Sequence, residues 1–310
     1  MPEIQTATGA LDTTRMGFTL THEHVIVRWP PMHLEYAHDF DRQAVLTIAV
    51  SRLRSAYEAG VRTLVDMTPP DLGRHAEMLR EASEQSGIHV VVATGFYWQI
   101  PMGFRYRPTA DIRDFMVREI DDGIGLTGIR AGVIKCASEH EVDRMNERVL
   151  RASAQAQATT GVPIGTHSSP LHRTGLDQAR ILVDAGANPH QVIIGHCDDA
   201  SDLEYLEAII ETGCSVGFDR FGITTPNTTE DRIRLIAGLI DRGHVHRIVL
   251  SHDASAYIET VTDELRDRMP DWRYEYIPTA VLPLMRERGI TDAEIDQMVR
   301  TNPQRIFSGS

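Results

Sequence analysis

The sequence predicts an α/β protein, a single (β/α)8 TIM barrel that occupies residues 1–310 as one domain. Eight short apolar runs recur along the chain, segments with helical periodicity separate them, and no linker or low-complexity stretch divides the sequence. The runs are continuous rather than alternating, which is typical of parallel strands buried on both faces. A doubly wound open sheet is the alternative, but eight units are many for such a sheet, and no G-x-G-x-x-G follows any predicted strand.

Each predicted strand is a run of small, aliphatic or β-branched residues. In chain order the strands are 17–21, 63–67, 89–93, 131–134, 162–166, 192–195, 214–218 and 248–251. Helices are predicted between them, and several are followed by a glycine such as Gly87 or Gly161. These helices cover 41–59, 74–86, 111–124, 142–160, 174–186, 201–212 and 228–242, and a last pair covers 274–288 and 291–300. The longest loops, 25–40, 96–110 and 254–273, follow strands, and in a barrel that side carries function.

The composition excludes several classes of protein. Hydrophobic residues make up 42% of the chain, which is enough for a large core. The 31 basic and 44 acidic residues give a net charge of −13, whereas a protein that binds nucleic acid or an anionic membrane normally has a basic excess. The three cysteines are odd in number and far apart, which argues against a disulfide framework. There is no signal-peptide pattern and no apolar run of roughly 20 residues, so we expect a soluble, cytoplasmic protein.

Metal-capable or ionisable side chains follow five of the eight predicted strands. His22 and His24 end the first strand and point the same way, so Glu23 between them is expected to point outward. The other strands with such residues end in Lys135, His167, His196 and Asp253. Taken singly, a histidine at a strand end is more often hydrogen-bonded than ligating, and an aspartate there can cap a helix. Together at one rim, four imidazoles and a carboxylate exceed what one tetrahedral zinc needs and suit two metals about 3.5–4 Å apart.

Lys135 follows the apolar run 131–134, so its amine is expected to be buried, where a charge without a partner is unfavourable. Two neighbouring metals share a bridging ligand, and a neutral amine is a poor bridge. We therefore hypothesise that Lys135 reacts with carbon dioxide to form a carbamate, an anion whose two oxygens can bridge two metals.

The short motifs that contain these residues are also informative through their order and spacing along the chain. The segments are 17–24, 131–135, 166–167, 194–197, 219–222, 250–253 and 302–307. They resemble the phosphotriesterase family of the amidohydrolase superfamily over nearly the whole chain. The resemblance implies a barrel with a binuclear metal centre, in which His22, His24 and Asp253 hold one metal and His167 and His196 the other. It also implies that a carboxylated Lys135 and a hydroxide bridge the two metals.

Residues 94–98 and 218–222 are similar to the phosphotriesterase-like lactonases. In that branch the tyrosine matching Tyr97 contacts the bridging hydroxide and the arginine matching Arg220 lies near the substrate opening. Without the resemblance, Tyr97 reads as an aromatic packed at the rim and Arg220 as part of a loop ion pair. Residues 254–256, Ala-Ser-Ala, depart from the bulky residues expected after the aspartate. Five apolar loop residues form either a pocket for an acyl chain or loop packing: Trp98, Ile100, Phe104, Tyr257 and Ile258.

The resemblance implies a metal-dependent hydrolase that opens acyl-homoserine or γ- and δ-lactones by attack of the bridging hydroxide and also hydrolyses organophosphate triesters. Asp253 then takes the proton and passes it to the leaving oxygen, while Tyr97 helps to stabilise the developing charge. The alternatives are an esterase or amidase for another small metabolite, a dedicated phosphotriesterase and a non-catalytic barrel scaffold. Zinc is the expected metal, and cobalt, manganese and iron accept the same ligands. The family resemblance also implies a homodimer.

Overall fold

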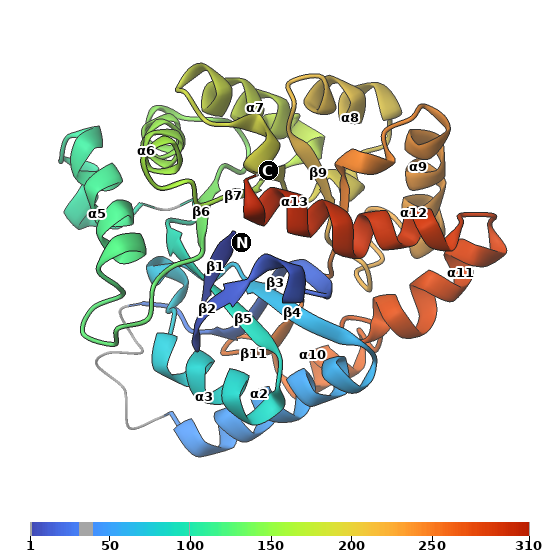
Figure 1. The fold of residues 1–310 in the computed structure, drawn as a ribbon, viewed down its shortest axis with the longest axis horizontal. Coiled ribbons are helices and arrows are strands. Elements are labelled where there is room, and N and C mark those ends of the chain that lie inside the picture. Colours follow the sequence, from blue (N-terminus) through green and yellow to red (C-terminus); the bar gives the residue numbers. More distant parts are fainter. Residues whose placement is uncertain (1, 31–39, 99, 310) are drawn as a thin grey trace.

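Within residues 2–30, 40–98 and 100–309, which the computed structural model describes, nine parallel strands form one curled sheet surrounded by helices (Figure 1). The sheet order is β10-β9-β8-β7-β6-β5-β4-β3-β11, so neighbours in the sheet are mostly neighbours along the chain. The strands are β3 (Phe18–Val27), β4 (Val61–Asp66), β5 (His89–Gly95), β6 (Val133–Ala137), β7 (Ile164–His167), β8 (Val192–Ile194), β9 (Ser215–Phe218), β10 (Ile248–Leu250) and β11 (Ser255–Ile258). Part of the predicted loop 25–40 lies outside the described residues.

The two halves of an interrupted last strand close the barrel. β10 pairs with β9, while β11, four residues further on, pairs with β3 through Ser255 and His24. Between the halves, the backbone N–H of Asp253 donates to the carbonyl of His22 at 3.1 Å, and the N–H of His24 donates to the carbonyl of Ala254 at 2.8 Å. The predicted TIM-barrel fold is therefore confirmed, with its eighth position filled by two short strands instead of one.

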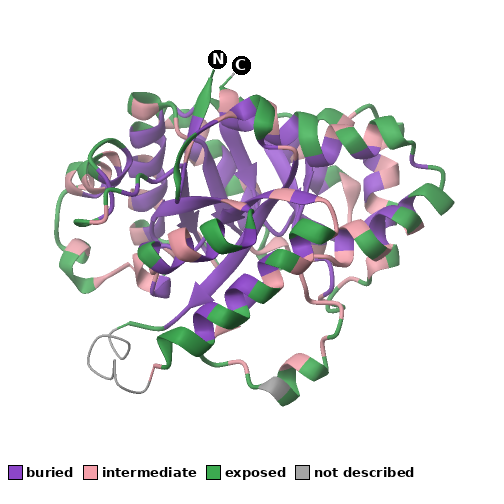
Figure 2. Ribbon diagram, turned by 60° about the horizontal axis from the view of Figure 1, so that its bottom comes forward, coloured by how far each residue is buried: buried purple, intermediate pink, exposed green. Residues whose placement is uncertain are grey.

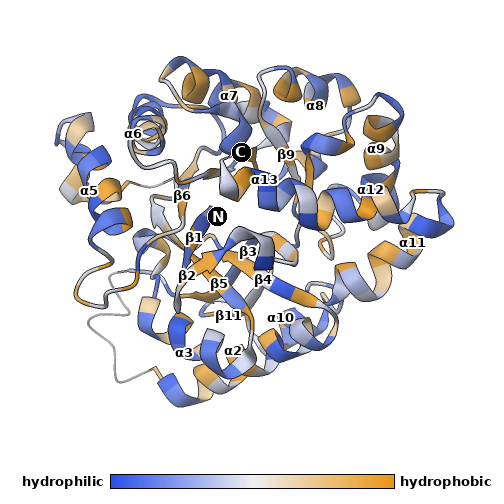
Figure 3. Ribbon diagram, in the orientation of Figure 1, coloured by the Kyte–Doolittle hydropathy of each residue, from blue (hydrophilic) through white to orange (hydrophobic). Residues whose placement is uncertain are grey.

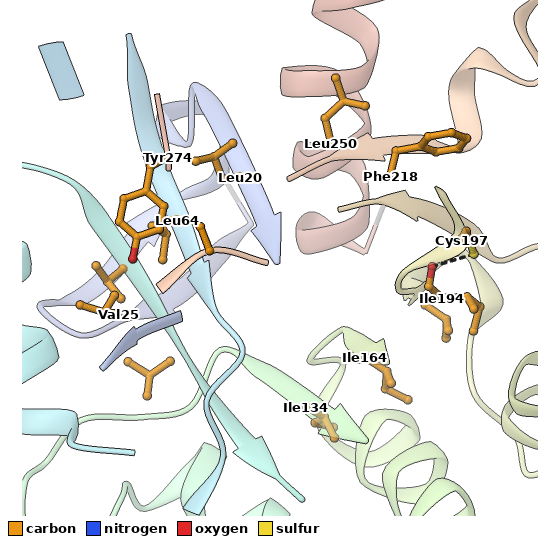
Figure 4. Close-up of a cluster of buried hydrophobic side chains, with 14 of the residues drawn as sticks. Leu20, Val25, Leu64, Ile134, Ile164, Ile194, Cys197, Phe218, Leu250 and Tyr274 are labelled. Atoms are coloured by element: carbon orange, nitrogen blue, oxygen red, sulfur yellow. Dashed lines mark hydrogen bonds between the residues drawn. The ribbon is translucent and has the colours of Figure 1, made fainter. Parts of the chain in front are cut away.

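The strands separate two apolar layers. One layer lies between the sheet and the helices, where the completely buried Leu64, Ile134 and Ile194 belong to the larger core cluster (Figure 4). The smaller cluster contains the alternate residues of the same strands, such as Val65 and Val133. Figures 2 and 3 show the result, a buried and largely apolar sheet inside helices whose outer sides are exposed and polar.

An antiparallel hairpin for which the sequence analysis assigned no element precedes the barrel. Its strands are β1 (Glu3–Thr6) and β2 (Gly9–Asp12). Ile4 and Leu11 of the hairpin join the smaller apolar cluster together with Ile306 and Phe307 from the last helix. Both chain ends therefore lie over the middle of the barrel (Figure 1). This face holds the N-terminal ends of the strands, so the hairpin covers the end opposite the strand-end residues predicted to bind metal.

All seven helices predicted between the strands form on their predicted ranges. They are α2 (Arg42–Glu58), α3 (Ala76–Ser86), α5 (Thr109–Asp121), α6 (Arg144–Thr160), α7 (Thr174–Asp184), α8 (Leu203–Ile210) and α9 (Thr229–Asp241). Asp143 caps α6 by accepting from two backbone N–H groups, and Gly87 and Gly161 end α3 and α6 with φ of 82° and 74°. None of the helices in the described residues is both long and apolar enough to cross a membrane.

Shorter helical segments complete the chain. α4 (Met102–Arg105) and α10 (Asp263–Asp267) lie in two of the long loops. The predicted closing pair forms as π-helical turns at Ile277–Val281 and Gln297–Thr301 with α11 (Leu282–Glu287) and α12 (Asp292–Asp296). α13 (Asn302–Ser308) continues beyond the predicted end at 300. Single 3₁₀ turns lie at Thr13–Arg15, Pro70–Leu72, Pro170–His172, Pro189–Gln191, Cys197–Asp199 and Val245–Arg247.

Candidate metal centre

All six residues predicted to bind metal meet at the C-terminal ends of the barrel strands. His22 and His24 lie on β3, Lys135 on β6, His167 at the end of β7, His196 two residues after β8 and Asp253 between β10 and β11. β3 continues six residues beyond its predicted end at 21, because its histidines lie inside the barrel mouth instead of in a loop. A register shift between Leu20 and Glu23 separates the two halves of this strand. Such a shift re-aims the side chains that follow it.

The ligand atoms of this group face one another in two halves. His24 Nε2 lies 3.3 Å and His22 Nε2 3.8 Å from Asp253 Oδ1, and these three residues can each offer a ligand atom within 4.8 Å of the others. In the second half, His196 Nε2 lies 2.8 Å from His167 Nδ1. Asp253 Oδ2 is 3.9 Å from His196 Nε2, so this carboxylate stands between the halves.

Lys135 lies on the buried strand β6 and not in a surface loop. Its side chain is completely enclosed, and its Nζ lies 2.9 Å from His22 Nε2. Burial lowers the pKa of Lys135 to about 8, although Asp253 and Asp219 raise it. Among the described residues no carboxylate forms an ion pair with it. The burial expected from the sequence is therefore present, and an amine without a carboxylate partner is left beside the histidines.

Asp219 orients two of the histidines, and the sequence analysis assigned it no role. Its Oδ1 accepts from His196 Nδ1 at 2.8 Å and from the His196 backbone N–H at 2.7 Å, and its Oδ2 lies 2.9 Å from His22 Nδ1. Two glycines make room for it: a Cβ on Gly217 would lie 2.7 Å and one on Gly195 3.1 Å from Asp219 Oδ2. Asp219 directly follows the seventh predicted strand, so the strand-end signal that found the other residues was present here too.

The charges in this group favour metal binding. Burial alone would raise the pKa of Asp219, but His196 and His22 hold it well below its usual value. Burial lowers the pKa of His22 to about 4 and that of His196 well below its usual value. Both rings are therefore neutral at physiological pH. With Nδ1 directed at Asp219, each ring leaves Nε2 as a lone-pair donor toward the centre.

The other two histidines also have a partner for the nitrogen that faces away from the centre. His24 Nδ1 lies 2.8 Å from the hydroxyl of Thr68, and His167 Nε2 lies 2.6 Å from Glu139 Oε2. Such partners fix the ring orientation and the tautomer of ligating histidines. Thr68 and Glu139 lie in the loops after β4 and β6 and were not predicted, because nothing in their local sequence distinguishes them.

Glu23 was expected to point outward, and it lies completely buried among backbone donors. Its Oε1 accepts from the backbone N–H and the Nδ1 of His252 at 2.9 and 2.7 Å, and its Oε2 accepts from the N–H of Ala254 at 2.8 Å. The hydroxyl of Ser251 donates to the same carboxylate at 2.8 Å. These bonds flank Asp253, whose φ of +54° is unfavourable for a non-glycine residue. Glu23 therefore holds the segment that presents Asp253.

Tyr97 and Arg220 line a cavity of about 220 Å³ together with Asp253 and three further predicted ligands, His24, Lys135 and His167. The Tyr97 ring lies edge-on to the His167 ring with centroids 5.0 Å apart, and Asp71 Oδ2 accepts from the Tyr97 backbone N–H at 2.8 Å. Arg220 Nη1 pairs with Asp199 at 2.8 Å. Its Nε lies 3.5 Å from Asp253 Oδ2 and has no hydrogen-bond partner among the described residues.

The apolar wall of this cavity differs from the predicted one. Of the five residues proposed for an acyl pocket, Ile258 lines it. Trp98, Ile100, Phe104 and Tyr257 do not: Phe104, for example, packs on Phe96 with ring centroids 5.0 Å apart. The remaining apolar wall consists of residues that were not predicted, Val27, Trp29, Leu72 and Trp272.

A second cavity of about 500 Å³ adjoins the first and shares His167 and Arg220 with it. Its other walls are mostly polar or charged and include Glu139, Arg173 and Asn227. The centre therefore lies between a small cavity with an apolar wall and a larger polar one.

Similarity to known proteins extends over nearly the whole chain. The family model described as the phosphotriesterase family matches residues 2–307. The solved structure of the phosphotriesterase from Mycobacterium tuberculosis is 39% identical, covers 99% of this chain and 98% of its own, and superposes with a TM-score of 0.94. The aryldialkylphosphatase of Saccharolobus solfataricus is 31% identical over 305 residues, 96% of this chain and 97% of that protein. The N-acetyltaurine hydrolase of Mus musculus is 26% identical over 345 residues, 98% of this chain and 97% of that protein.

Proposed function

The chain belongs to the phosphotriesterase family of hydrolases, and from that premise we propose that it opens lactones at a binuclear metal centre and also hydrolyses organophosphate triesters. One observation carries the proposal. Four imidazoles, a buried lysine and a carboxylate meet at one barrel mouth, and each imidazole has a partner for the nitrogen that faces away from the centre. A structural histidine cluster does not need its inward nitrogens to converge on one point with their outward nitrogens held by partners, whereas a metal centre does.

The donor set fits two divalent ions. His22, His24 and Asp253 would hold one, and His167 and His196 the other. Lys135 Nζ lies within hydrogen-bond distance of His22, where its carbamate would supply the shared anionic ligand. Imidazole and carboxylate ligands suit zinc, and also cobalt, manganese and iron. The ions would supply a water molecule whose pKa lies near neutrality and a Lewis acid for a carbonyl or phosphoryl oxygen.

Asp253 is the proton acceptor in this proposal. Burial alone would raise its pKa, but His196 and His24 hold it well below its usual value, so the carboxylate is ionised at neutral pH. It receives the proton of the attacking water and returns it to the leaving oxygen, which in a lactone remains part of the product. Arg220 keeps its charge throughout, because Asp253 and Asp199 raise its pKa despite burial. Its unpartnered Nε and the Tyr97 hydroxyl are donors for the negative charge that develops on the substrate.

The cavities bear on the substrate. The small cavity places the side chains of Leu72, Ile258 and Trp272 beside the metal-binding residues, which supports a substrate with an alkyl or acyl group. The polar second cavity, with Arg173 and Asn227, favours a different candidate, a hydrolase for an ester or amide with a polar leaving group. The similarity to N-acetyltaurine hydrolase, whose name states an amide substrate, supports this second candidate.

Parallel kinetics on metal-loaded protein test the proposal. Acyl-homoserine lactones, simple γ- and δ-lactones, an aryl dialkyl phosphate and N-acyl amino sulfonates are compared, with metal per chain measured on the same sample. We expect two metals per chain and a kcat/KM for a lactone at least 100-fold above that for the phosphotriester. Tyr97→Phe should lower kcat for that lactone, while Trp98→Phe, a neighbouring aromatic outside the cavity, should not. Slow hydrolysis of every lactone together with rapid hydrolysis of the amide would replace the first candidate by the second.

A further inference from the structure

A third cavity lies at the other end of the barrel, far along the strands from the metal centre. Its volume is about 300 Å³, within the range of small-ligand sites. It lies where the turns Pro189–Gln191 and Val245–Arg247 lead into β8 and β10, beside α13. The side chains that define it are His190, His246, Arg247 and Arg305, with the amides of Asn188 and Gln297 beside them. We call this the basic cavity.

The charge of the basic cavity is opposite to that of the whole protein. The chain has 44 acidic and 31 basic residues, yet no aspartate or glutamate lines this cavity within the described part of the chain. Two of its walls carry a permanent positive charge, on Arg247 and Arg305. The two histidine rings add further N–H groups, of which that of His246 has a hydrogen bond with the backbone of Gly243. An uncompensated concentration of donors of this kind attracts anions.

Neither of the two half-buried guanidinium groups pairs with a carboxylate among the described residues, as is also true of Arg52 and Arg80. Arg28, Arg74 and Arg232 each pair with a carboxylate, at 3.4, 2.6 and 2.6 Å. Arg305 donates instead to the carbonyls of His190 and His246, both at 3.2 Å, and to the Ser215 hydroxyl at 3.4 Å, and Arg247 donates to the carbonyl of Gly213 at 2.7 Å.

These contacts fix the side chains but do not neutralise them. Burial lowers the pKa of both arginines, and the charge of Arg247 lowers that of Arg305 further. Neutralisation by a bound anion would relieve this repulsion.

We propose that the basic cavity binds a small divalent oxyanion of the phosphate or sulfate type between Arg247 and Arg305. Guanidinium groups bind such anions through charge-assisted hydrogen bonds, which are about twice as strong as neutral ones. The bound anion links the turns before β8 and β10 to α13. The same two strands lead to His196 and Asp253 at their other ends, so occupancy stabilises the barrel that positions the metal centre.

The test uses metal-loaded protein and inorganic sulfate, with chloride added to keep the ionic strength constant. Equilibrium dialysis with labelled sulfate measures binding, and thermal unfolding measures stabilisation. Arg247→Gln removes one charge from the cavity. Arg180→Gln is the matched control, because Arg180 is an exposed arginine on α7. Arg247→Lys keeps the charge, and His246→Gln gives a second variant if Arg247→Gln does not fold.

We expect saturable binding of about one sulfate per chain, weakened at least tenfold in Arg247→Gln, at most twofold in Arg180→Gln and partly restored in Arg247→Lys. At 100 times Kd, sulfate should raise Tm by about 4 °C. Phosphate should compete with sulfate for the same site. Lactone hydrolysis should be equal in all variants, which separates this site from anions at the metal centre. Equal sulfate binding by Arg247→Gln and the wild type overturns the proposal. Equal stabilisation of all variants by sulfate also overturns it, because sulfate stabilises proteins in general by exclusion from their surface.

Discussion

Replacing Asp219 with asparagine is expected to weaken metal binding by disabling one of the two histidines that it orients. The carboxylate offers one oxygen to His196 Nδ1 and the other to His22 Nδ1, at 2.8 and 2.9 Å. An asparagine has one acceptor oxygen and one amide donor. If the oxygen serves His196, which also donates its backbone N–H, the amide faces His22. His22 must then carry its proton on Nε2, the atom that faces the centre.

The size of the effect follows from the number of rings affected. Loss of one orienting partner typically weakens metal binding about 10–100-fold, or about 1.4–2.7 kcal/mol. Asp219→Asn affects one ring and should lie in that range. Asp219→Ala affects both rings and should reach about 10²–10⁴-fold if the two effects add. Thr68→Val removes the partner of His24 alone and should resemble the asparagine variant, whereas Glu139→Gln keeps an acceptor for His167 and should change binding less than tenfold.

The assay is dialysis of metal-loaded proteins against a graded chelator, followed by metal analysis per chain, with circular dichroism as the check on folding. The metal held by His22, His24 and Asp253 should leave first in Asp219→Asn. A folded Asp219→Asn that keeps both metals at the chelator concentrations tolerated by the wild type would refute the reasoning. Equal losses of metal in the asparagine and alanine variants would also contradict the prediction, because Asp219→Asn disturbs one histidine ring and Asp219→Ala disturbs two.

Three further predictions concern single groups. Lys135→Ala should lose metal and activity, and acetate or bicarbonate should partly restore both; metal analysis with and without acetate checks this, and a complete lack of rescue contradicts the carbamate. Glu23→Gln leaves one acceptor oxygen for the four groups that donate to the Glu23 carboxylate. A lost hydrogen bond to a buried charge costs about 1.5–3 kcal/mol, so Tm should fall by about 5 °C. Occupancy of the metal bound by Asp253 should fall as well. Burial raises the pKa of Asp71 to about 7. Between about pH 4 and 7 the metal-free folded protein therefore binds more protons than the unfolded chain. The free energy of unfolding then falls as the pH rises through that window. Urea unfolding at pH 5 and 8 should show that Asp71→Asn removes this loss, and equal slopes in both proteins would count against it.

The barrel could be predicted because each strand and helix leaves a local signal. The predicted helices between strands all form, and the predicted strands all overlap observed ones. The differences have physical reasons. The prediction ended β3 at residue 21 because His22 and Glu23 read as polar, yet both are buried inside a continuing strand. The β1–β2 hairpin was missed because only Ile4 and Leu11 face the core, too few for a periodic pattern.

The residues of the candidate site could also be predicted only in part. Residues at strand ends could be found, since parallel strands bring their C-terminal ends to one rim. Thr68 and Glu139 could not, because their role depends on which histidine the fold places beside them. Phe104 and Tyr257 were predicted to line an acyl pocket, but they pack on other aromatic rings. The direction of an apolar side chain in a loop depends on the path of the loop, which the local sequence does not determine.

The division between strand ends and loops also explains how one centre can serve different substrates. The predicted metal-binding residues and the buried Glu23 and Asp219 lie on the barrel strands or next to them, and neither Glu23 nor Asp219 lines the small cavity. Leu72, Tyr97 and Trp272, which do line it, lie in loops. Side-chain changes at Leu72 and Tyr97 leave the hydrogen bonds of Glu23 and Asp219 in place and reshape the space around the reacting bond. Relatives that are 26% and 31% identical to this chain are named N-acetyltaurine hydrolase and aryldialkylphosphatase. We therefore expect the residues that line the cavity, and not the six predicted metal-binding residues, to decide which of the proposed reactions this protein performs.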